Sequence, residues 1–354
     1  MTPAIDELLH AMHERGGTAL HLTAALTPKI RVAGHLEPVA DATLDETTLT
    51  EMLRAIAPPG AWATFLKTLD VEFGWHVPGL PRFRVTYFGQ ETGSGAIFRA
   101  IPTSVTSWSD LGLPDAATSW LELNRGLVLI VAPPDSGKST TLGAFVDHIN
   151  RTRDAHIVTI EDPIEFEHLP RMSSLSQRQV GEHTQSLATG LRFALRQSPD
   201  IIVATDLNDA ESVDLALRGA EKGILVVVTL SSRSVTSALQ GLVECFPDEQ
   251  HSSTRERLSR VLEGALALRL LSRRDGEGRI AACEFMYRTP AVAAAIAADE
   301  FERIASLIEQ GREVGMQSMD DSLLQLVADA RISPREAYRK ATDKQRFEPL
   351  LTNE

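Results

Sequence analysis

The second half of the chain contains short, continuous apolar runs separated by segments with helical spacing. The apolar runs cover residues 126–131, 156–160, 200–205 and 224–230. Apolar side chains three or four positions apart lie between them, at residues 142–149, 187–195 and 210–221. Continuous apolar strands that alternate with helices are typical of a parallel sheet covered on both faces. Beyond residue 250 the pattern predicts mostly helix, apart from one strand at 279–287.

The first half combines helical spacing with alternating patterns. Helical spacing covers residues 1–15 and 46–67, and Pro58-Pro59-Gly60 interrupts the second of these segments. Alternation typical of half-buried strands occurs at 20–22, 29–32, 82–88 and 96–101. The TGSG sequence at 92–95 can turn the chain between the last two strands. The first half is therefore predicted to be a mixed domain dominated by hairpins.

The length of 354 residues and this change in pattern indicate two domains. Turn-forming residues without any periodicity occupy the region between the halves. We expect an N-terminal domain at 1–103, a linker at 104–116, an α/β domain at 117–288 and a C-terminal helical region at 289–354.

Composition narrows the classes of function. The net charge of −13 argues against a bulk nucleic-acid binder, which needs a basic face to neutralise phosphates. The two cysteines, Cys245 and Cys283, form no CxxC pair and indicate a reducing cytoplasm. The apolar runs are far shorter than the roughly 20 residues needed to span a bilayer, and the N-terminus lacks a signal-peptide pattern.

The sequence VAPPDSGKST at 131–140 matches a phosphate-binding loop between a predicted strand and a predicted helix. In such a loop, converging backbone N–H groups and the helix N-terminus bind phosphate oxygens. The lysine adds a positive charge, and the serine hydroxyl binds Mg²⁺. A flexible helix-entry loop without a ligand is the alternative. The predicted nucleotide-binding residues are Ala132, Pro133, Pro134, Asp135, Ser136, Gly137, Lys138, Ser139 and Thr140.

Asp135 is unusual in this loop, because a carboxylate repels a triphosphate. If its side chain points outward at about 8 Å, the penalty in a high dielectric is about 0.5 kcal/mol or less. Asp135 is therefore not interpreted as inactivating.

Acidic residues follow two of the predicted strands. Glu161, Asp162 and Glu165 lie at or just after the strand end at 160, and Asp206 follows the run at 200–205. Ligands of parallel α/β sheets bind at these carboxyl ends. A carboxylate there can orient an attacking water or hold Mg²⁺. The alternative is that each acid is an ordinary loop residue.

With these motifs in place, the sequence resembles the PilT/PilU family of type IV pilus retraction motors, within the secretion ATPases. The resemblance covers nearly the whole chain. SQRQVG at 176–181 and the tail past Gly315 look more like the PilU branch. The matching segments are LHLTAALTPKIRVAGHL (20–36), GLPRFRVTYFGQ (79–90), IFRAIP (97–102), RGLVLIV (125–131), SGKSTTL (136–142), IVTIEDPIEFEH (157–168), ALRQSPDII (194–202), LVECFP (242–247) and GMQS (315–318).

This resemblance implies a PAS-like N-terminal α+β domain and a RecA-like P-loop ATPase domain. It implies ATP and Mg²⁺ as cofactors, bound between the subunits of a hexameric ring. By position, Lys138 matches the phosphate-loop lysine, Glu165 the catalytic glutamate and Asp206 the Walker B acid, with Ser139 and Asp206 as the Mg²⁺-associated residues. The implied place is the cytoplasmic side of the inner membrane, against the pilus platform protein.

Several positions depart from the family pattern. Ile224 and Ser231 stand where the family usually has histidines, and Asp206 stands where it usually has glutamate. An arginine of the Walker B stretch is missing at 205–208, and residues 291–298 read AVAAAIAA instead of a charged, retraction-linked motif. The Ile224 side chain cannot form hydrogen bonds, and the Ser231 hydroxyl does not titrate as an imidazole does.

Arginines on the N-terminal strands are candidates to act on the site of a neighbouring subunit, namely Arg82, Arg84 and Arg99. Solvent-facing strand arginines are the alternative for each. Two hypotheses follow: an active retraction motor ATPase, or a weakly hydrolysing paralogue that binds nucleotide and assists a PilT-like motor. A RecA-type DNA helicase or packaging ATPase is a third reading, against which the acidic net charge counts.

Overall fold

The computed structural model describes residues 4–32, 35–102, 104–134, 136–276 and 278–351. Contacts divide the chain into two compact units. The first consists of Met1–Ser104 together with Glu165–Glu167, and the second of Val105–Ile164 and His168–Glu354. Within the described residues, no helix is both long and apolar enough to cross a membrane.

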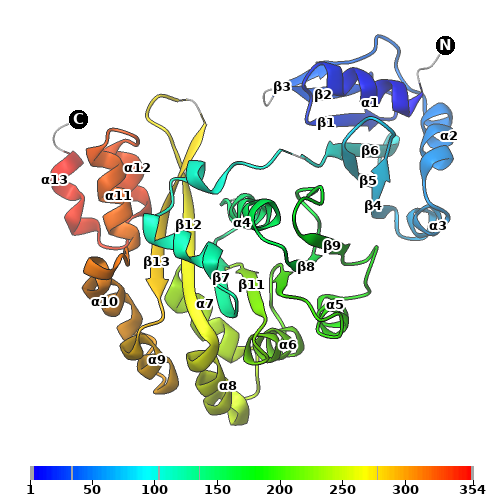
Figure 1. The fold of residues 1–354 in the computed structure, drawn as a ribbon. Coiled ribbons are helices and arrows are strands. Elements are labelled where there is room, and N and C mark those ends of the chain that lie inside the picture. The colour runs from blue at the N-terminus through cyan, green and yellow to red at the C-terminus, as the bar shows by residue number, and fades with distance from the viewer. Residues whose placement is uncertain (1–3, 33–34, 103, 135, 277, 352–354) are drawn as a thin grey trace. The chain divides into compact units, whose positions relative to one another are not determined.

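The N-terminal unit is an antiparallel sheet in the order β3-β2-β1-β6-β5-β4, with helices packed on one face (Figure 1). Its strands are β1 (Ala19–Thr23), β2 (Lys29–Val32), β3 (His35–Pro38), β4 (Asp70–His76), β5 (Arg82–Gln90) and β6 (Gly93–Ala100). Its helices are α1 (Ile5–Glu14), α2 (Glu46–Ile56) and α3 (Pro59–Thr68). Alternate strand residues such as Phe83, Val85 and Tyr87 are fully buried against these helices.

The second unit contains a sheet in the order β13-β12-β7-β11-β10-β8-β9. Its neighbours from β12 to β9 run parallel, and β13 is antiparallel to β12. The strands are β7 (Gly126–Val131), β8 (His156–Glu161), β9 (Ser174–Gln179), β10 (Ile201–Ala204), β11 (Leu225–Leu230), β12 (Leu262–Ser272) and β13 (Arg279–Tyr287).

Helices cover both faces of this sheet. Leu127 and Leu129 of β7 belong to one core with α5–α8, and Val128 and Ile130 belong to the opposite core with α4. The helices are α4 (Lys138–Thr152), α5 (Leu187–Ala194), α6 (Ala210–Glu221), α7 (Val235–Glu244), α8 (Asp248–Val261), α9 (Pro290–Ala297), α10 (Arg303–Gln310), α11 (Met319–Ala328), α12 (Pro334–Lys340) and α13 (Glu348–Leu351). The 3-10 turns are η1 (Trp108–Leu111), η2 (Asp115–Glu122), η3 (Gly311–Val314) and η4 (Lys344–Arg346).

The C-terminal helices extend this unit beside the long β12–β13 hairpin (Figure 1). Leu271 and Ala282 of the hairpin share a small core with Leu323 and Phe347 of the C-terminal segment. In the AVAAAIAA segment, Val292, Ala295 and Ile296 are buried, as expected for a helix that packs against a core.

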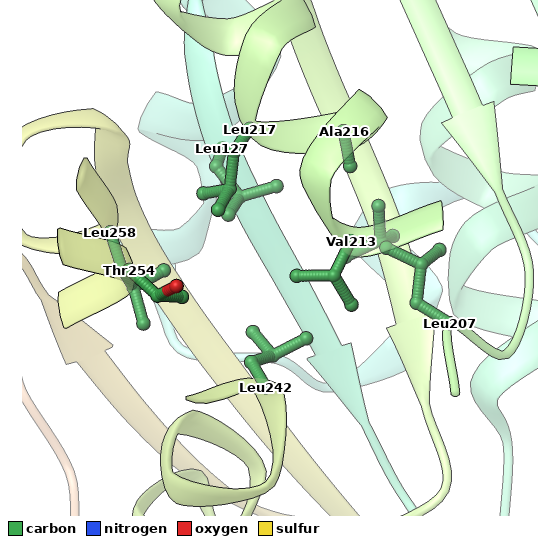
Figure 2. A pocket seen from close by; sticks show the side chains of 9 residues that line it. Leu127, Leu207, Val213, Ala216, Leu217, Leu242, Thr254 and Leu258 are labelled. Carbon is green, nitrogen blue, oxygen red and sulfur yellow. The ribbon is translucent and has the colours of Figure 1, made fainter. Parts of the chain in front are cut away.

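An apolar pocket lies between β7 and the helices α6, α7 and α8 (Figure 2). Thr254 supplies the single hydroxyl among its lining side chains, which are Leu127, Leu207, Val213, Ala216, Leu217, Val228, Leu242, Thr254 and Leu258. A ligand site needs several convergent polar groups, so we interpret this space as part of the core.

The structure corrects three expectations. Residues 262–272 were expected to be helical but form β12, because pairing with β7 and β13 outweighs the helix propensity of ALALRLL. Strands β3, β4 and β9 were not predicted. The sequence of β9 is largely polar, whereas Val71, Phe73 and Trp75 of β4 form an alternating pattern that could have indicated a strand. The turn expected at 92–95 falls at residues 91–92, and Gly93-Ser94-Gly95 already pair with β5.

The expected linker at 104–116 lies largely within the second unit. Trp108 is 6% exposed and packs edge-on against Phe145 of α4, with 6.0 Å between ring centroids. The turn residues of this segment therefore connect packed 3-10 turns. The positions of the remaining domain boundaries stay predictions.

Candidate functional site

The segment between β7 and α4 has the geometry of an anion-binding loop. Ala132 is buried, and its N–H donates to Leu230 O of the neighbouring strand at 3.0 Å. Thr141 N donates to Gly137 O at 3.0 Å at the start of α4. The N–H groups of the preceding first-turn residues therefore have no intrahelical acceptor. No acidic residue lies in the first turn of α4, so its partial positive charge can attract an anion.

Gly137 is required by its backbone conformation rather than by lack of space. Its φ is 95°, in the left-handed region. A Cβ added there would meet Leu270 at 3.8 Å, which is an ordinary contact. The cost of a side chain at Gly137 therefore lies in the positive φ. Asp135 lies outside the described residues.

The Lys138 ammonium joins three strand ends. Its Nζ donates to Ala132 O at 3.0 Å and to Ser231 Oγ at 2.8 Å, and it lies 3.4 Å from Asp206 Oδ1. The Ser231 hydroxyl donates to Asp206 Oδ1 at 3.0 Å. The Lys138 side chain is 11% exposed, whereas that of Asp206 is 45% exposed. Lys138 and Asp206, both predicted from sequence, thus lie together at the carboxyl edge of the sheet.

Threonines hold the backbone around Asp206. Thr229 Oγ1 accepts from Asp206 N at 2.9 Å, and Asp206 adopts a positive φ of 48°. Thr205 Oγ1 accepts from Asp162 N at 2.9 Å, which ties the end of β8 to the end of β10. These threonines were not predicted as site residues. A threonine next to a buried apolar strand end is the signal that could have indicated them.

The acids after β8 occupy different environments. The side chain of Glu161 is buried and accepts from Thr159 Oγ1 at 2.7 Å and from Gln177 Nε2 at 3.1 Å. Asp162 is exposed. Glu165 is also exposed, and it groups with the N-terminal unit, where Glu167 N donates to Pro102 O at 3.3 Å. A position of Glu165 at the phosphate loop therefore stays a prediction.

The candidate arginines lie on neighbouring strands of the N-terminal unit. Arg82 and Arg84 belong to β5, and Arg84 pairs in register with Arg99 of β6. Arg84 Nε lies 3.9 Å from Glu72 Oε1. The pKa of the neighbouring His21 is lowered, first by burial and then by the positive charges of Arg31 and Arg99. The register places two like charges side by side on one sheet face, and a role in a neighbouring subunit stays a prediction.

Comparisons with known proteins identify the family. Residues 80–284 match the family described as type II/IV secretion system protein. The chain is 38% identical to the type IV pilus retraction ATPase PilT of Pseudomonas aeruginosa, over 97% of this chain and 99% of that protein. It is 32% identical to the type IV pilus ATPase PilU of the same organism, over 95% and 88%. Whole-chain identity is thus higher to PilT, although two segments resemble PilU.

The fold agrees with the sequence comparison. The crystal structure of the pilus retraction motor PilT with bound ADP aligns over 98% of this chain and all of that chain, with a TM-score of 0.91 and 32% identity. An α/β architecture with an N-terminal domain and a RecA-like secretion-ATPase domain is therefore confirmed. The chain belongs to the type II/IV secretion system protein family, among the type IV pilus ATPases of the PilT/PilU type.

Proposed function

We propose that this protein is a motor ATPase of type IV pilus retraction that binds ATP with Mg²⁺ at residues 132–140. The observation that carries the proposal is the convergence of Lys138, Ser231 and Asp206 at the start of α4. A cation at a helix N-terminus, beside a carboxylate at the carboxyl end of β10 in the same sheet, suits a magnesium–triphosphate ligand. Family membership supports the same assignment.

The residues present fit both parts of this ligand. The open first turn of α4 and the Lys138 ammonium offer donors to phosphate oxygens. Ser139 and Asp206 offer hard oxygen atoms. In the described ranges no group of three His, Cys, Asp or Glu side chains could hold a metal ion. This suits Mg²⁺, which proteins usually hold through one or two side chains together with substrate phosphates. When bound, Mg²⁺ neutralises charge that develops on the phosphates.

The roles of the side chains follow from their chemistry. Lys138 would donate to the phosphates in place of Asp206, because a triphosphate carries more negative charge than one carboxylate. Asp206 would then be available to hold Mg²⁺. Glu165 orients the attacking water, and an arginine among Arg82, Arg84 and Arg99 stabilises transition-state charge in a neighbouring subunit. This requires a ring, which we propose to be a hexamer on the cytoplasmic side of the inner membrane, against the pilus platform protein.

A weakly hydrolysing paralogue that assists a PilT-like motor in a mixed assembly is the second candidate. The observation in its favour is the Lys138–Asp206 pair, which an incoming nucleotide must separate. The hydroxyl of Ser231 strengthens this pair, and Ser231 cannot titrate as a histidine would. Ser231, Ile224 and the shorter acid Asp206 therefore favour slow turnover without preventing nucleotide binding.

Steady-state hydrolysis of ATP with Mg²⁺ distinguishes the candidates. The wild-type oligomer is compared with Lys138→Ala, Glu165→Gln and Lys222→Ala, the last being an exposed lysine on the same unit. For a motor, turnover is lost in the first two variants and retained in Lys222→Ala. If wild type binds ATP but turns over no faster than Glu165→Gln, the assisting paralogue is the correct reading. Absence of ATP binding would overturn both.

A further inference from the structure

The loop between β8 and β9 is held at two points by alternate side chains of one strand. Ile164 N donates to Gln179 Oε1 at 3.2 Å, and His168 N donates to Gln177 Oε1 at 2.8 Å. Residues two apart on a strand point to the same face, so both glutamines are directed toward the loop. Glu165 lies between the two attachment points, one residue after Ile164.

The attachment at Gln177 continues into a buried polar network. Gln177 Nε2 donates to Glu161 Oε1 at 3.1 Å, and Thr159 Oγ1 donates to the same oxygen at 2.7 Å. Thr159 is 1% exposed and Glu161 is 8% exposed. Such buried polar groups are costly unless each has a partner.

An amide is required at position 177 because this side chain both accepts and donates. Its oxygen receives the His168 N–H, and its nitrogen supplies a hydrogen to Glu161. A glutamate at 177 would keep the first bond but would place a second carboxylate against Glu161, with no hydrogen to share. The side chain of His168 is buried too, with 9% of it exposed, and this burial lowers its pKa.

We propose that Gln177 and Gln179 are positioning residues that fix both ends of the segment carrying Glu165, with Glu161 and Thr159 orienting Gln177. This inference rests on the proposed function, because it assigns the clamp to ATP hydrolysis. Glu161 accordingly acts through Gln177. The expected consequence of releasing the clamp is a loss of turnover without a loss of nucleotide affinity, because the phosphate loop is not part of it.

The test uses three variants of the full chain. Gln177→Glu places a carboxylate against Glu161. The double variant Glu161→Gln/Gln177→Glu exchanges the two groups, so that the amide at position 161 donates to the carboxylate at position 177 and the network is restored. Gln185→Glu adds the same charge at an exposed position of the same unit and serves as the control. ATP affinity, kcat and amide hydrogen exchange over residues 162–170 are measured for each.

For Gln177→Glu we expect kcat to fall by about 10- to 100-fold with unchanged ATP affinity, since misplacement by about 1 Å costs this much. Exchange over 162–170 should rise about tenfold. The double variant and Gln185→Glu should resemble wild type in both measurements. The exchange measurement needs no activity, so it separates failure of the clamp from failure of the proposed function.

Three results would overturn the inference. The first is wild-type kcat and exchange in Gln177→Glu. The second is a folded double variant that stays as impaired as Gln177→Glu, because the exchange of groups would then have repaired nothing. The third is an equal loss in Gln185→Glu. If Gln177→Glu does not fold, the double variant still tests the inference. A hydrogen bond between an amide and a carboxylate at positions 161 and 177 predicts that the second substitution restores folding and turnover.

Discussion

Replacing Gly137 by alanine tests whether backbone conformation governs the phosphate loop. The φ of 95° is strained for any residue with a Cβ, while the nearest atoms to that Cβ, those of Leu270, are 3.8 Å away. The substitution therefore adds conformational strain without a steric clash. Gly241→Ala is a matched control, because Gly241 lies inside α7 without a positive φ and a Cβ there would meet nothing within 4 Å.

The left-handed conformation costs an alanine about 1–2 kcal/mol. If the loop keeps its conformation, this cost appears as lower stability of the second unit. If the loop relaxes, nucleotide binding must restore the conformation, and affinity falls about 5- to 30-fold, since about 1.4 kcal/mol corresponds to a factor of ten. The loss of folding stability and the loss of nucleotide-binding free energy should together amount to about 1–2 kcal/mol. Gly241→Ala should instead gain about 0.5–1 kcal/mol of stability and leave affinity unchanged.

Both quantities can be measured on the same samples. A fluorescent ATP analogue gives the affinity with Mg²⁺, and denaturant unfolding without nucleotide gives the stability. Strain is excluded as the cause if Gly137→Ala matches wild type in both measurements. It is also excluded if the variant loses far more stability than about 1–2 kcal/mol, because the site would then be sterically closed to a side chain.

Three further outcomes concern Phe285, Glu284 and Cys283 of β13. Phe285→Ala should cost about 3–5 kcal/mol in denaturant unfolding, because Phe285 is fully buried against Trp120; a loss below about 1 kcal/mol would contradict this packing. Burial raises the pKa of Glu284, so this carboxyl group costs stability as pH rises above its unfolded value of about 4.3. Glu284→Gln keeps an oxygen for Val235 N–H, so it should be more stable than wild type at pH 7–8, with the gain vanishing below about pH 4; a gain equal at both pH values would exclude ionisation as its cause. Burial raises the pKa of Cys283 to about 12, so a thiol reagent at pH 8 should label it only on unfolding, and rapid labelling of the native protein, followed by mass spectrometry, would show that this part of the core opens.

The local pattern of apolar and polar residues predicted most of the second unit, because apolar runs mark the segments that are buried. The runs at 126–131 and 224–230 became β7 and β11, which are buried on both faces. The proposed phosphate loop could also be predicted, because the loop residues, the strand before them and the helix after them are consecutive in the sequence. Strand β12 could not be predicted, because its alanines and leucines suit a helix equally well. Only the pairing with β7 and β13 makes this segment a strand.

For the candidate site, too, some features depend on the local sequence and others on the tertiary structure. The sequence by itself determined which residues are proposed to bind phosphate, because Gly137, Lys138 and Ser139 are neighbours in one loop. Only the tertiary structure brought Lys138 to Ser231 and Asp206, which come from strands far apart in sequence and meet because parallel strands end at one edge of the sheet. The tertiary structure likewise made Gln177 and Gln179 a clamp for the loop before them, because a hydrogen-bond partner is chosen by proximity in space.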